Sequence, residues 1–302
     1  MDKEVVLITG GTGLVGKVLK PMLETAGYQV IMLSRSVKNN QSYLWDIEKK
    51  FIDKEAIVKC DHLIHLAGSG IADKSWTDKR KKEIINSRTD SSELLLQYFQ
   101  QQGRAIKTVV AASAVGFYGS VTGEKIYTEA DENGKGFLAE TCVLWEKATQ
   151  KLANISERLV QLRIGIVLDK NGGALKKLAQ PVYFYAGAAL GSGKQYMPWI
   201  HVYDLCNMIL FAIQNKQLSG VFNAVSSSHT NNEEFTKAIG SVLHRPVFLP
   251  AVPAFVLKMF LGEMSQMVLE GSKISNEKIK KAGFKFRYDK VDDALKAIYQ
   301  NN

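Results

Sequence analysis

A glycine-rich segment near the amino terminus, residues 9–16 with the sequence TGGTGLVG, most constrains the fold of this chain. It follows a short β-branched and aliphatic run, 5–8, and precedes a helically spaced stretch, 14–26. A G-x-G-x-x-G pattern between a strand and a helix is typical of a loop that cradles phosphates. Glycine permits positive φ and close approach of a pyrophosphate, and the helix N-terminus offers free N–H groups. The segment therefore predicts a dinucleotide-binding unit, with a glycine-rich turn of no function as the alternative.

Short apolar runs alternate with longer helical patterns through the first part of the chain. Strand-like runs occupy 29–34, 62–67, 107–113 and 158–164, and a long amphipathic stretch spans 76–102. Near-continuous apolar strands that alternate with helices are typical of a parallel sheet covered by helices on both faces. We therefore predict an α/β fold with a Rossmann-like, doubly wound parallel sheet.

The pattern changes after residue 166, where glycine-rich loops lead into a mostly helical part that prolines interrupt. We predict a dinucleotide-binding domain over residues 1–165, to which a segment at about 199–225 returns. Residues 166–302 are predicted to form a smaller, mostly helical carboxyl-terminal lobe that holds the substrate. Because the loops of such a lobe set specificity, the fold alone does not name the substrate.

Charge and cysteine content narrow the range of partners. The 302 residues include 39 Lys and Arg against 30 Asp and Glu, and the net charge of +9 favours an anionic ligand. The basic runs share predicted helices with acidic residues, so we expect no nucleic-acid partner. Three widely spaced cysteines predict neither a metal site nor a disulfide framework. No signal-peptide pattern and no membrane-spanning run is found, so we expect a cytoplasmic protein without membrane contact.

The residue that follows the second strand distinguishes two nicotinamide cofactors. An acidic residue about 20 positions after the glycines bonds the ribose hydroxyl of NAD, whereas an Arg accommodates the 2′-phosphate of NADP. Ser34 and Arg35 end this strand, and no acidic residue is found there. We therefore predict NADP as the cofactor, although Arg35 could also be an ordinary solvated residue.

Further short motifs follow the glycine-rich segment in order through nearly the whole chain. They are 34–35 (SR), 45–46 (WD), 66–68 (LAG), 85–88 (INSR), 113–119 (SAVGFYG), 137–140 (FLAE), 145–146 (WE), 163–168 (RIGIVL), 199–201 (WIH), 253–255 (PAF) and 282–284 (AGF). With these motifs the sequence resembles the extended or atypical branch of the short-chain dehydrogenase/reductase superfamily. It resembles more closely the epimerase-family proteins labelled cell-division inhibitor SulA-like, which carry a carboxyl-terminal domain of unknown function.

The resemblance implies an NADP-binding Rossmann domain and a set of cofactor contacts. Residues 66–68 are expected to line the adenosine side, Asp46 to lie near the adenine, and Glu83 and Arg88 to face the cofactor from the long helix. The predicted set is Gly10, Thr12, Gly13, Leu14, Val15, Gly16, Ser34, Arg35, Asp46, Leu66, Ala67, Gly68, Glu83 and Arg88. Two alternatives stay open, since residues 66–68 could simply finish a buried strand and Glu83 could belong to a solvated charged run.

The proton relay that most members of this superfamily share is missing. They pair a Tyr with a Lys four residues later, which lowers the pKa of the phenol. None of the eleven tyrosines here has Lys at that spacing. The corresponding helix is expected to place Cys142 and Glu146 at the two positions. This departure argues against tyrosine-based redox catalysis and leaves cofactor binding intact.

The remaining candidates for proton transfer lie in the same predicted crevice. Ser113 follows the fourth strand, Tyr118 lies just beyond it, and Glu140 begins the next helix. Each has another reading: Ser113 could cap a turn, Tyr118 could pack in the core, and Glu140 could only complement the helix N-terminus. Ser113, Tyr118 and Glu140 are nevertheless our predicted catalytic residues.

Two functions fit these observations. The first is an NADP(H)-dependent oxidoreductase or epimerase-like enzyme that acts on an unidentified small molecule. The second is a non-catalytic NADP(H)-binding redox sensor or regulatory protein, which the missing Tyr and Lys pair favours. Self-association as a homodimer is left open by the sequence.

Overall fold

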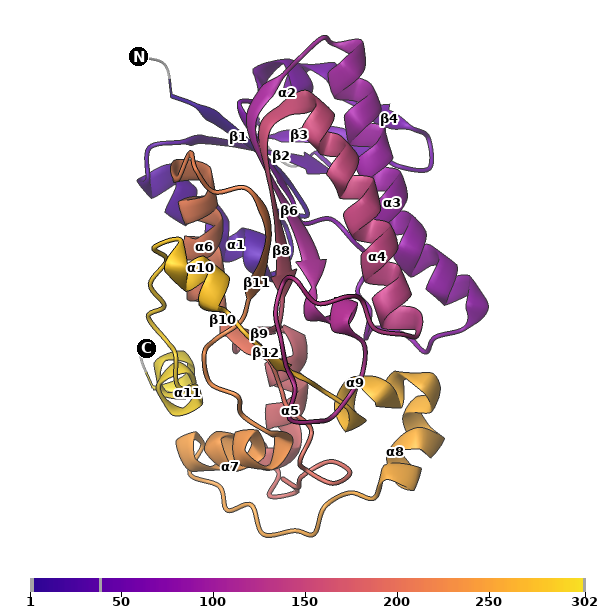
Figure 1. The fold of residues 1–302 in the computed structure, drawn as a ribbon, viewed down its shortest axis with the longest axis vertical. Helices are drawn as coiled ribbons and strands as arrows, with labels where there is room; N and C mark the ends of the chain where they lie inside the picture. The colour runs from indigo at the N-terminus through magenta and orange to yellow at the C-terminus, as the bar shows by residue number, and fades with distance from the viewer. Residues whose placement is uncertain (1–2, 38–39, 301–302) are drawn as a thin grey trace.

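The computed structural model describes residues 3–37 and 40–300, and its centre is one eight-stranded sheet (Figure 1). The strand order is β11-β8-β6-β5-β1-β2-β3-β4, and only the β3–β4 pair is antiparallel. The strands are β1 (Val5–Thr9), β2 (Gln29–Ser34), β3 (Ser42–Asp46), β4 (Phe51–Ile52), β5 (His62–His65), β6 (Ile106–Ala114), β8 (Ser156–Ile164) and β11 (Gly220–Ala224). The order reverses beside β1, which confirms the predicted Rossmann-like parallel sheet.

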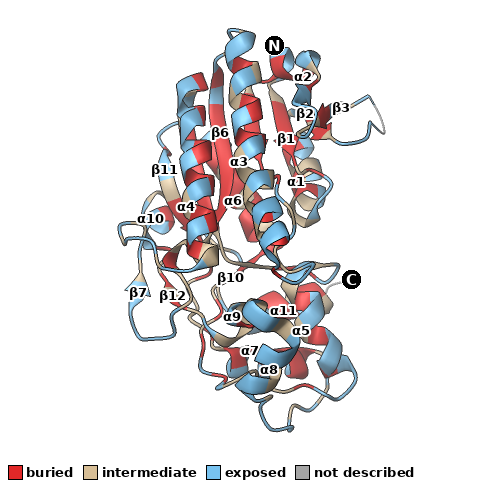
Figure 2. Ribbon diagram, turned by 90° about the vertical axis from the view of Figure 1, so that its right-hand side faces the viewer, coloured by how far each residue is buried: buried red, intermediate tan, exposed pale blue. Residues whose placement is uncertain are grey.

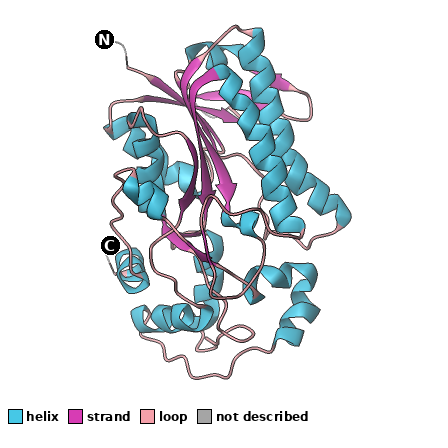
Figure 3. Cartoon of the chain, in the orientation of Figure 1, coloured by secondary structure: helices cyan, strands magenta, loops and turns pink. Residues whose placement is uncertain are grey.

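Helices cover both faces of this sheet, as Figures 1 and 3 show. The layer on one face contains α2 (Lys54–Lys59), α3 (Asp78–Gln101) and α4 (Phe137–Gln150), and the layer on the other contains α1 (Leu14–Thr25) and α6 (Val202–Gln214). Successive residues of a strand point to opposite faces. Accordingly Val6 and Ile8 pack with α1 and α6, while Leu7 packs in the core that includes α3. Burial on both faces explains why the strands are continuously apolar.

A smaller lobe lies beyond the carboxyl ends of the strands (Figure 1). Its core surrounds Trp199, Phe235 and Leu295, which are almost fully buried. The helices of this core are α5 (Gly173–Tyr183), α7 (Asn232–Val242) and α11 (Val291–Tyr299), beside the paired strands β9 (Ile166–Leu168) and β10 (Trp199–His201). The chain returns from β10 through α6 to β11, which extends the main sheet beside β8.

Two further parts of the lobe differ in how they are held. The strand pair β7 (Ile126–Tyr127) and β12 (Lys273–Ile274) joins the loop after β6 to the carboxyl-terminal segment. By contrast, α8 (Ala254–Leu261) has no buried residue, and Figure 2 shows it pale blue at the surface. The short helices α9 (Gln266–Leu269) and α10 (Glu277–Lys281) follow it along the chain.

Asp204 of α6 fixes the carboxyl-terminal segment to the body of the protein. Its buried carboxylate accepts the backbone N–H groups of Arg287 and Tyr288, each at 2.9 Å. Burial raises the pKa of Asp204, while these two hydrogen bonds oppose the rise. The carboxylate of Asp204 thus links α6 to the carboxyl-terminal segment.

Within residues 3–37 and 40–300, no helix combines the length and the apolar character needed to cross a bilayer.

Candidate functional site

The glycine-rich segment forms a tight turn between β1 and α1, at the edge where the strands end. Gly10 has a φ of 70°, and the N–H of Gly13 donates to the carbonyl oxygen of Gly10 at 3.0 Å. A Cβ on Gly16 would lie 2.4 Å from the carbonyl oxygen of Gly11, so the turn closes only because residue 16 has no side chain. Gly13 is the N-cap of α1 and no side chain caps the helix. The first-turn N–H groups are therefore suited to bind a diphosphate.

A buried polar cluster holds the turn against the neighbouring strand end. The hydroxyl of Thr9 lies 2.7 Å from Nδ1 of His65 and accepts the N–H of Ala67 at 3.2 Å. Nε2 of His65 lies 3.1 Å from the hydroxyl of Ser92 on α3. Burial lowers the pKa of His65 to about 4, so the ring is neutral at pH 7. These contacts fix the ends of β1 and β5 relative to each other.

The side of the turn expected to face the adenosine is formed by β2 and β3. Arg35 follows β2 and is exposed, while the hydroxyl of Ser34 accepts the N–H of Ser36 at 3.4 Å. Asp46 ends β3, and its carboxylate accepts the N–H of Lys49 at 3.0 Å. Since β2 and β3 are adjacent and parallel, their ends lie at the same edge of the sheet. The structure thus gathers these predicted contacts at one edge, and their roles stay predictions.

The end of β5 and the long helix α3 bring Gly68 and Arg88 together. A Cβ on Gly68 would lie 3.1 Å from Cζ of Arg88, whose guanidinium stacks on Trp145 at 4.8 Å from the ring centroid. Burial lowers the pKa of Arg88. Glu83 differs, because it is exposed and forms an ion pair with Arg80 at 2.6 Å. Its carboxylate also accepts a hydrogen bond from the hydroxyl of Ser69, next to Gly68, at 3.4 Å. Both α3 residues thus lie near the end of β5, and their contacts with the cofactor stay predictions.

A row of polar side chains crosses the ends of three adjacent strands. Ser113 of β6 is paired in register with Arg163 of β8, which is paired with Asn223 of β11. Residues in register share a face of the sheet. Glu146 of α4 lies over this row, and its Oε1 accepts a hydrogen bond from the hydroxyl of Ser113 at 2.7 Å. Its two oxygens also accept hydrogen bonds from Nε and Nη2 of Arg163, at 2.8 and 2.9 Å.

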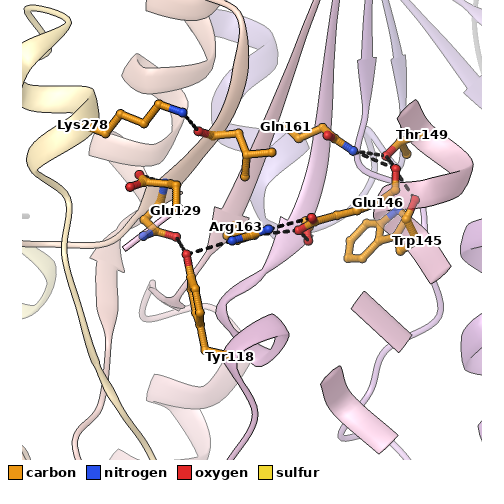
Figure 4. Close-up of polar contacts among 11 residues, drawn as sticks. Tyr118, Glu129, Trp145, Glu146, Thr149, Gln161, Arg163 and Lys278 are labelled. Atoms are coloured by element: carbon orange, nitrogen blue, oxygen red, sulfur yellow. Dashed lines mark hydrogen bonds and ion pairs between the residues drawn. The ribbon is translucent and has the colours of Figure 1, made fainter. Parts of the chain in front are cut away.

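Tyr118 lies in the 3-10 helix after β6 (Val115–Tyr118) and is 1% exposed. Its hydroxyl donates a hydrogen bond to Oδ1 of Asn223 at 2.7 Å. It accepts a hydrogen bond from Nη1 of Arg163 at 3.0 Å, as Figure 4 shows. Burial raises the pKa of the Tyr118 phenol, and Arg163 partly opposes this effect. The phenol is thus engaged in hydrogen bonds within the protein, and its catalytic role stays a prediction.

Glu140, the predicted proton-transfer group of α4, differs in exposure from Cys142 of the same helix. Glu140 lies in the first turn of the helix and is exposed. Cys142 is buried, and burial raises the pKa of its thiol to about 12. Its sulfur would lie 3.6 Å from a Cβ on Gly116, so Cys142 and Glu146 both face the chain that ends β6. The helix therefore presents a thiol and a carboxylate toward this chain, and their match to the Tyr and Lys positions of the superfamily stays a prediction.

Arg163 and Asn223 belong to the site, although the sequence did not single them out as functional residues. Each is a polar residue inside an apolar strand run, which is the signal that could have found them. Among the described residues, no group of three or more His, Cys, Asp or Glu side chains is placed to hold a metal ion.

Comparisons with known proteins agree with this geometry. Residues 6–137 match the NAD dependent epimerase/dehydratase family, and residues 252–298 match a domain of unknown function (DUF1731). Epimerase family protein YfhF of Bacillus subtilis (strain 168) is 35% identical over 298 residues, which cover 97% of each chain. The chain belongs to the epimerase family. The SDR39U1 homolog, chloroplastic, of Arabidopsis thaliana is 38% identical over 98% of this epimerase-family chain and 86% of the relative.

A solved structure of a relative extends the comparison to three dimensions. The crystal structure of human epimerase family protein SDR39U1 (isoform2) with NADPH has a TM-score of 0.89 and 29% sequence identity, over 99% of this chain and 100% of that chain. The comparisons confirm the Rossmann-like fold and a nicotinamide dinucleotide as the cofactor class of the family. The descriptions of these relatives give no support to the SulA-like label that the sequence resemblance carried.

Proposed function

We propose that this epimerase-family protein is an NADP(H)-dependent oxidoreductase or epimerase-like enzyme that acts on a small molecule. The observation that carries the proposal is the shared edge of the sheet, where an uncapped, glycine-lined helix start lies next to a row of polar side chains. Ligands of open α/β sheets bind outside the carboxyl ends of the strands, beside the point where the strand order reverses. When bound there, the cofactor supplies or accepts a hydride.

The chain's own residues supply the binding and the proton handling. The turn at Gly10–Gly16 and the N-terminus of α1 receive the diphosphate, and Arg35 receives the 2′-phosphate. Ser113, near the carboxyl end of β6, faces the substrate oxygen at which the proton is transferred. The Bacillus and Arabidopsis relatives carry the epimerase-family name, and the human relative was crystallised with NADPH, which supports NADP for this chain.

Calorimetric titration with NADPH and NADH tests the cofactor assignment. Replacing Arg35→Ala removes a charge-assisted contact worth about 1.5–3 kcal/mol, so NADPH affinity falls roughly 10- to 150-fold. The affinity for NADH, which lacks the 2′-phosphate, stays unchanged. Arg104→Ala is the matched control, because Arg104 precedes β6 at the opposite edge of the sheet. Equal affinity of the unchanged protein for NADH and NADPH contradicts the assignment.

A non-catalytic redox sensor is the second candidate function. It is favoured by one observation: the hydroxyls of Ser113 and Tyr118 are both engaged in hydrogen bonds inside the protein. Incubation with NADP(H) and a panel of carbonyl compounds and secondary alcohols separates the two functions by absorbance of the nicotinamide. Turnover that disappears in Ser113→Ala supports the enzyme. Tight NADPH binding without any turnover supports the sensor.

Self-association as a homodimer is a separate proposal, and analytical sedimentation of the same samples tests it.

A further inference from the structure

The direction of the Ser113 hydroxyl restricts what the site can bind. A hydroxyl has one proton to donate and two lone pairs that accept. The proton of Ser113 is directed to Oε1 of Glu146 at 2.7 Å. Toward a ligand, Ser113 therefore offers only lone pairs, and the group that meets it must itself be a donor. An alcohol O–H satisfies this requirement, whereas a ketone oxygen does not.

Glu146 is fixed in position by the groups that surround its carboxylate. Its carboxylate forms a two-point ion pair with Arg163, and the two side chains are 11% and 5% exposed (Figure 4). A two-point contact between a guanidinium and a carboxylate fixes both groups in one geometry. Arg163 is in turn held by the hydroxyl of Tyr118 and by its contact with the ring of Phe117, whose centroid lies 3.4 Å from Cζ.

The charged and titratable groups around Glu146 come from each element packed against it. Arg163 comes from β8, Tyr118 follows β6, and Cys142 lies one turn earlier on α4. Arg88 of α3 stacks on Trp145, and its charge opposes the rise in the pKa of the Cys142 thiol that burial causes. Among these described neighbours the cations outnumber the carboxylates, and no second carboxylate is hydrogen-bonded to Glu146.

We propose that Ser113 takes the proton of a substrate hydroxyl while it passes its own proton to Glu146, with Arg163 as the positioning residue. This inference rests on the proposed function. The substrate class is then a secondary alcohol, and the favoured direction is its oxidation with NADP⁺. The O–H bond of the substrate breaks and its proton goes to Oγ of Ser113. The proton of Ser113 goes to Oε1 of Glu146. The C–H bond of the substrate breaks, its hydrogen moves with the electron pair as hydride to the oxidised nicotinamide, and the substrate becomes a ketone.

The first arm of the test measures oxidation of a panel of secondary alcohols (2-butanol, cyclohexanol and 1-indanol) with NADP⁺ across pH. General-base catalysis contributes about 10²–10⁴-fold. Glu146→Gln and Ser113→Ala are therefore expected to lower kcat/KM by at least about 100-fold. Glu157→Gln, an exposed carboxylate at the start of β8, is the matched control and leaves rate and profile unchanged.

The second arm needs no turnover and compares the affinities for NADP⁺ and NADPH by calorimetry. The oxidised ring carries a positive charge, and Glu146→Gln leaves the Arg163 charge uncompensated at the edge of the sheet where we propose that the cofactor binds. At separations of several ångströms such a charge raises the ratio of the two dissociation constants by at least about threefold in favour of NADPH. Ser113→Ala and Glu157→Gln leave the ratio unchanged. Glu146→Asp keeps the charge and the ratio but moves the carboxylate away from Ser113, so its oxidation rate falls.

The outcomes separate the relay from the proposed function. Alcohol oxidation that Glu146→Gln or Ser113→Ala leaves intact overturns the relay and leaves the proposed function standing. Reduction of ketones without alcohol oxidation at any pH also overturns it, as does an unchanged NADP⁺/NADPH ratio in Glu146→Gln. No binding of either cofactor overturns the proposed function itself. Circular dichroism checks folding. If Glu146→Gln does not fold, the oxidation rate of Glu146→Asp decides, and an unchanged rate in that variant overturns the relay.

Discussion

Two neighbouring parts of the same sheet edge are built in opposite ways. The glycine-rich turn, residues 10–16, relies on backbone groups and on missing side chains, since a Cβ at Gly16 would collide with Gly11. The polar row of Ser113, Arg163 and Asn223, with Glu146 over it, relies on side chains from four elements that are fixed by hydrogen bonds. The difference teaches that the shape of the turn is encoded locally, whereas the meeting of the polar side chains depends on the packing of α4 against β6 and β8.

The largest expected effect concerns the stability of the polar row. Arg163→Met leaves the buried carboxylate of Glu146 without its partner, which costs about 3–5 kcal/mol of unfolding free energy. Replacing both residues by Met is expected to recover much of this loss, because no uncompensated charge remains. Urea unfolding measures each value. Lys280→Met, which breaks an exposed pair with Glu277, is the control and costs under about 1 kcal/mol. A loss as small as that of the control would show that the pair is not truly buried.

The next effect concerns the glycine-rich turn. In Gly16→Ala the new Cβ lies 2.4 Å from the Gly11 carbonyl oxygen, so the turn must open and the N–H groups move away from the diphosphate. NADPH affinity is expected to fall about 100-fold, or roughly 2.7 kcal/mol. Quenching of protein fluorescence by NADPH measures it. Gly123→Ala, where a Cβ meets nothing within 4 Å, keeps the original affinity. Unchanged binding in Gly16→Ala would contradict the idea that the missing side chain is essential.

The smallest effect is a pH dependence that both lobes share. Burial lowers the pKa of His65, beside the turn, and that of His201, in the smaller lobe, to about 4. Histidine in the unfolded chain has a pKa near 6.5. Below pH 6.5 the unfolded chain therefore binds protons at these two positions that the folded chain does not bind. Stability is therefore full above about pH 6.5 and falls as pH drops toward 4. At pH 5 each histidine accounts for about 2 kcal/mol of the loss.

Urea midpoints at pH 7 and pH 5 measure this loss in single variants. His65→Gln and His201→Asn are each expected to flatten the dependence, and the Asn retains a side chain able to cap α6. His244→Asn, at an exposed position, keeps the slope of the unchanged protein. Should both buried-site variants retain the full slope, other groups control the acid sensitivity.

Much of the main sheet was predictable, because the strands are buried on both faces and read as apolar runs. The second strand, 29–34, agrees with β2, and the turn between β1 and α1 lies where the glycines stand. The helix expected to begin at Glu140 instead begins at Phe137, since Gly136 with a φ of 93° ends the preceding loop. The two-residue pair β7 and β12 was not predicted, because it joins segments about 150 positions apart and has no local periodicity.

The site was predictable to different degrees. The fourth strand was expected over 107–113 with Ser113 at its end, whereas β6 spans Ile106–Ala114. The register places Ser113 beside Arg163, which no local pattern signalled. Glu146 was noted only as a replacement for a Lys. That its carboxylate accepts the Ser113 hydroxyl follows from how α4 packs on the sheet. The catalytic roles expected for Ser113, Tyr118 and Glu140 stay predictions.

By itself the sequence determined the parallel sheet, the phosphate-binding turn and the absence of a Tyr and Lys pair, because each is a matter of residue type at short spacing. Only the tertiary structure decided which polar groups meet: Ser113 with Glu146, Glu146 with Arg163, and Asp204 with the backbone of the carboxyl-terminal segment. The physical reason is that a hydrogen bond needs its two atoms within about 3 Å, and for residues far apart in the chain only the packed fold sets that distance.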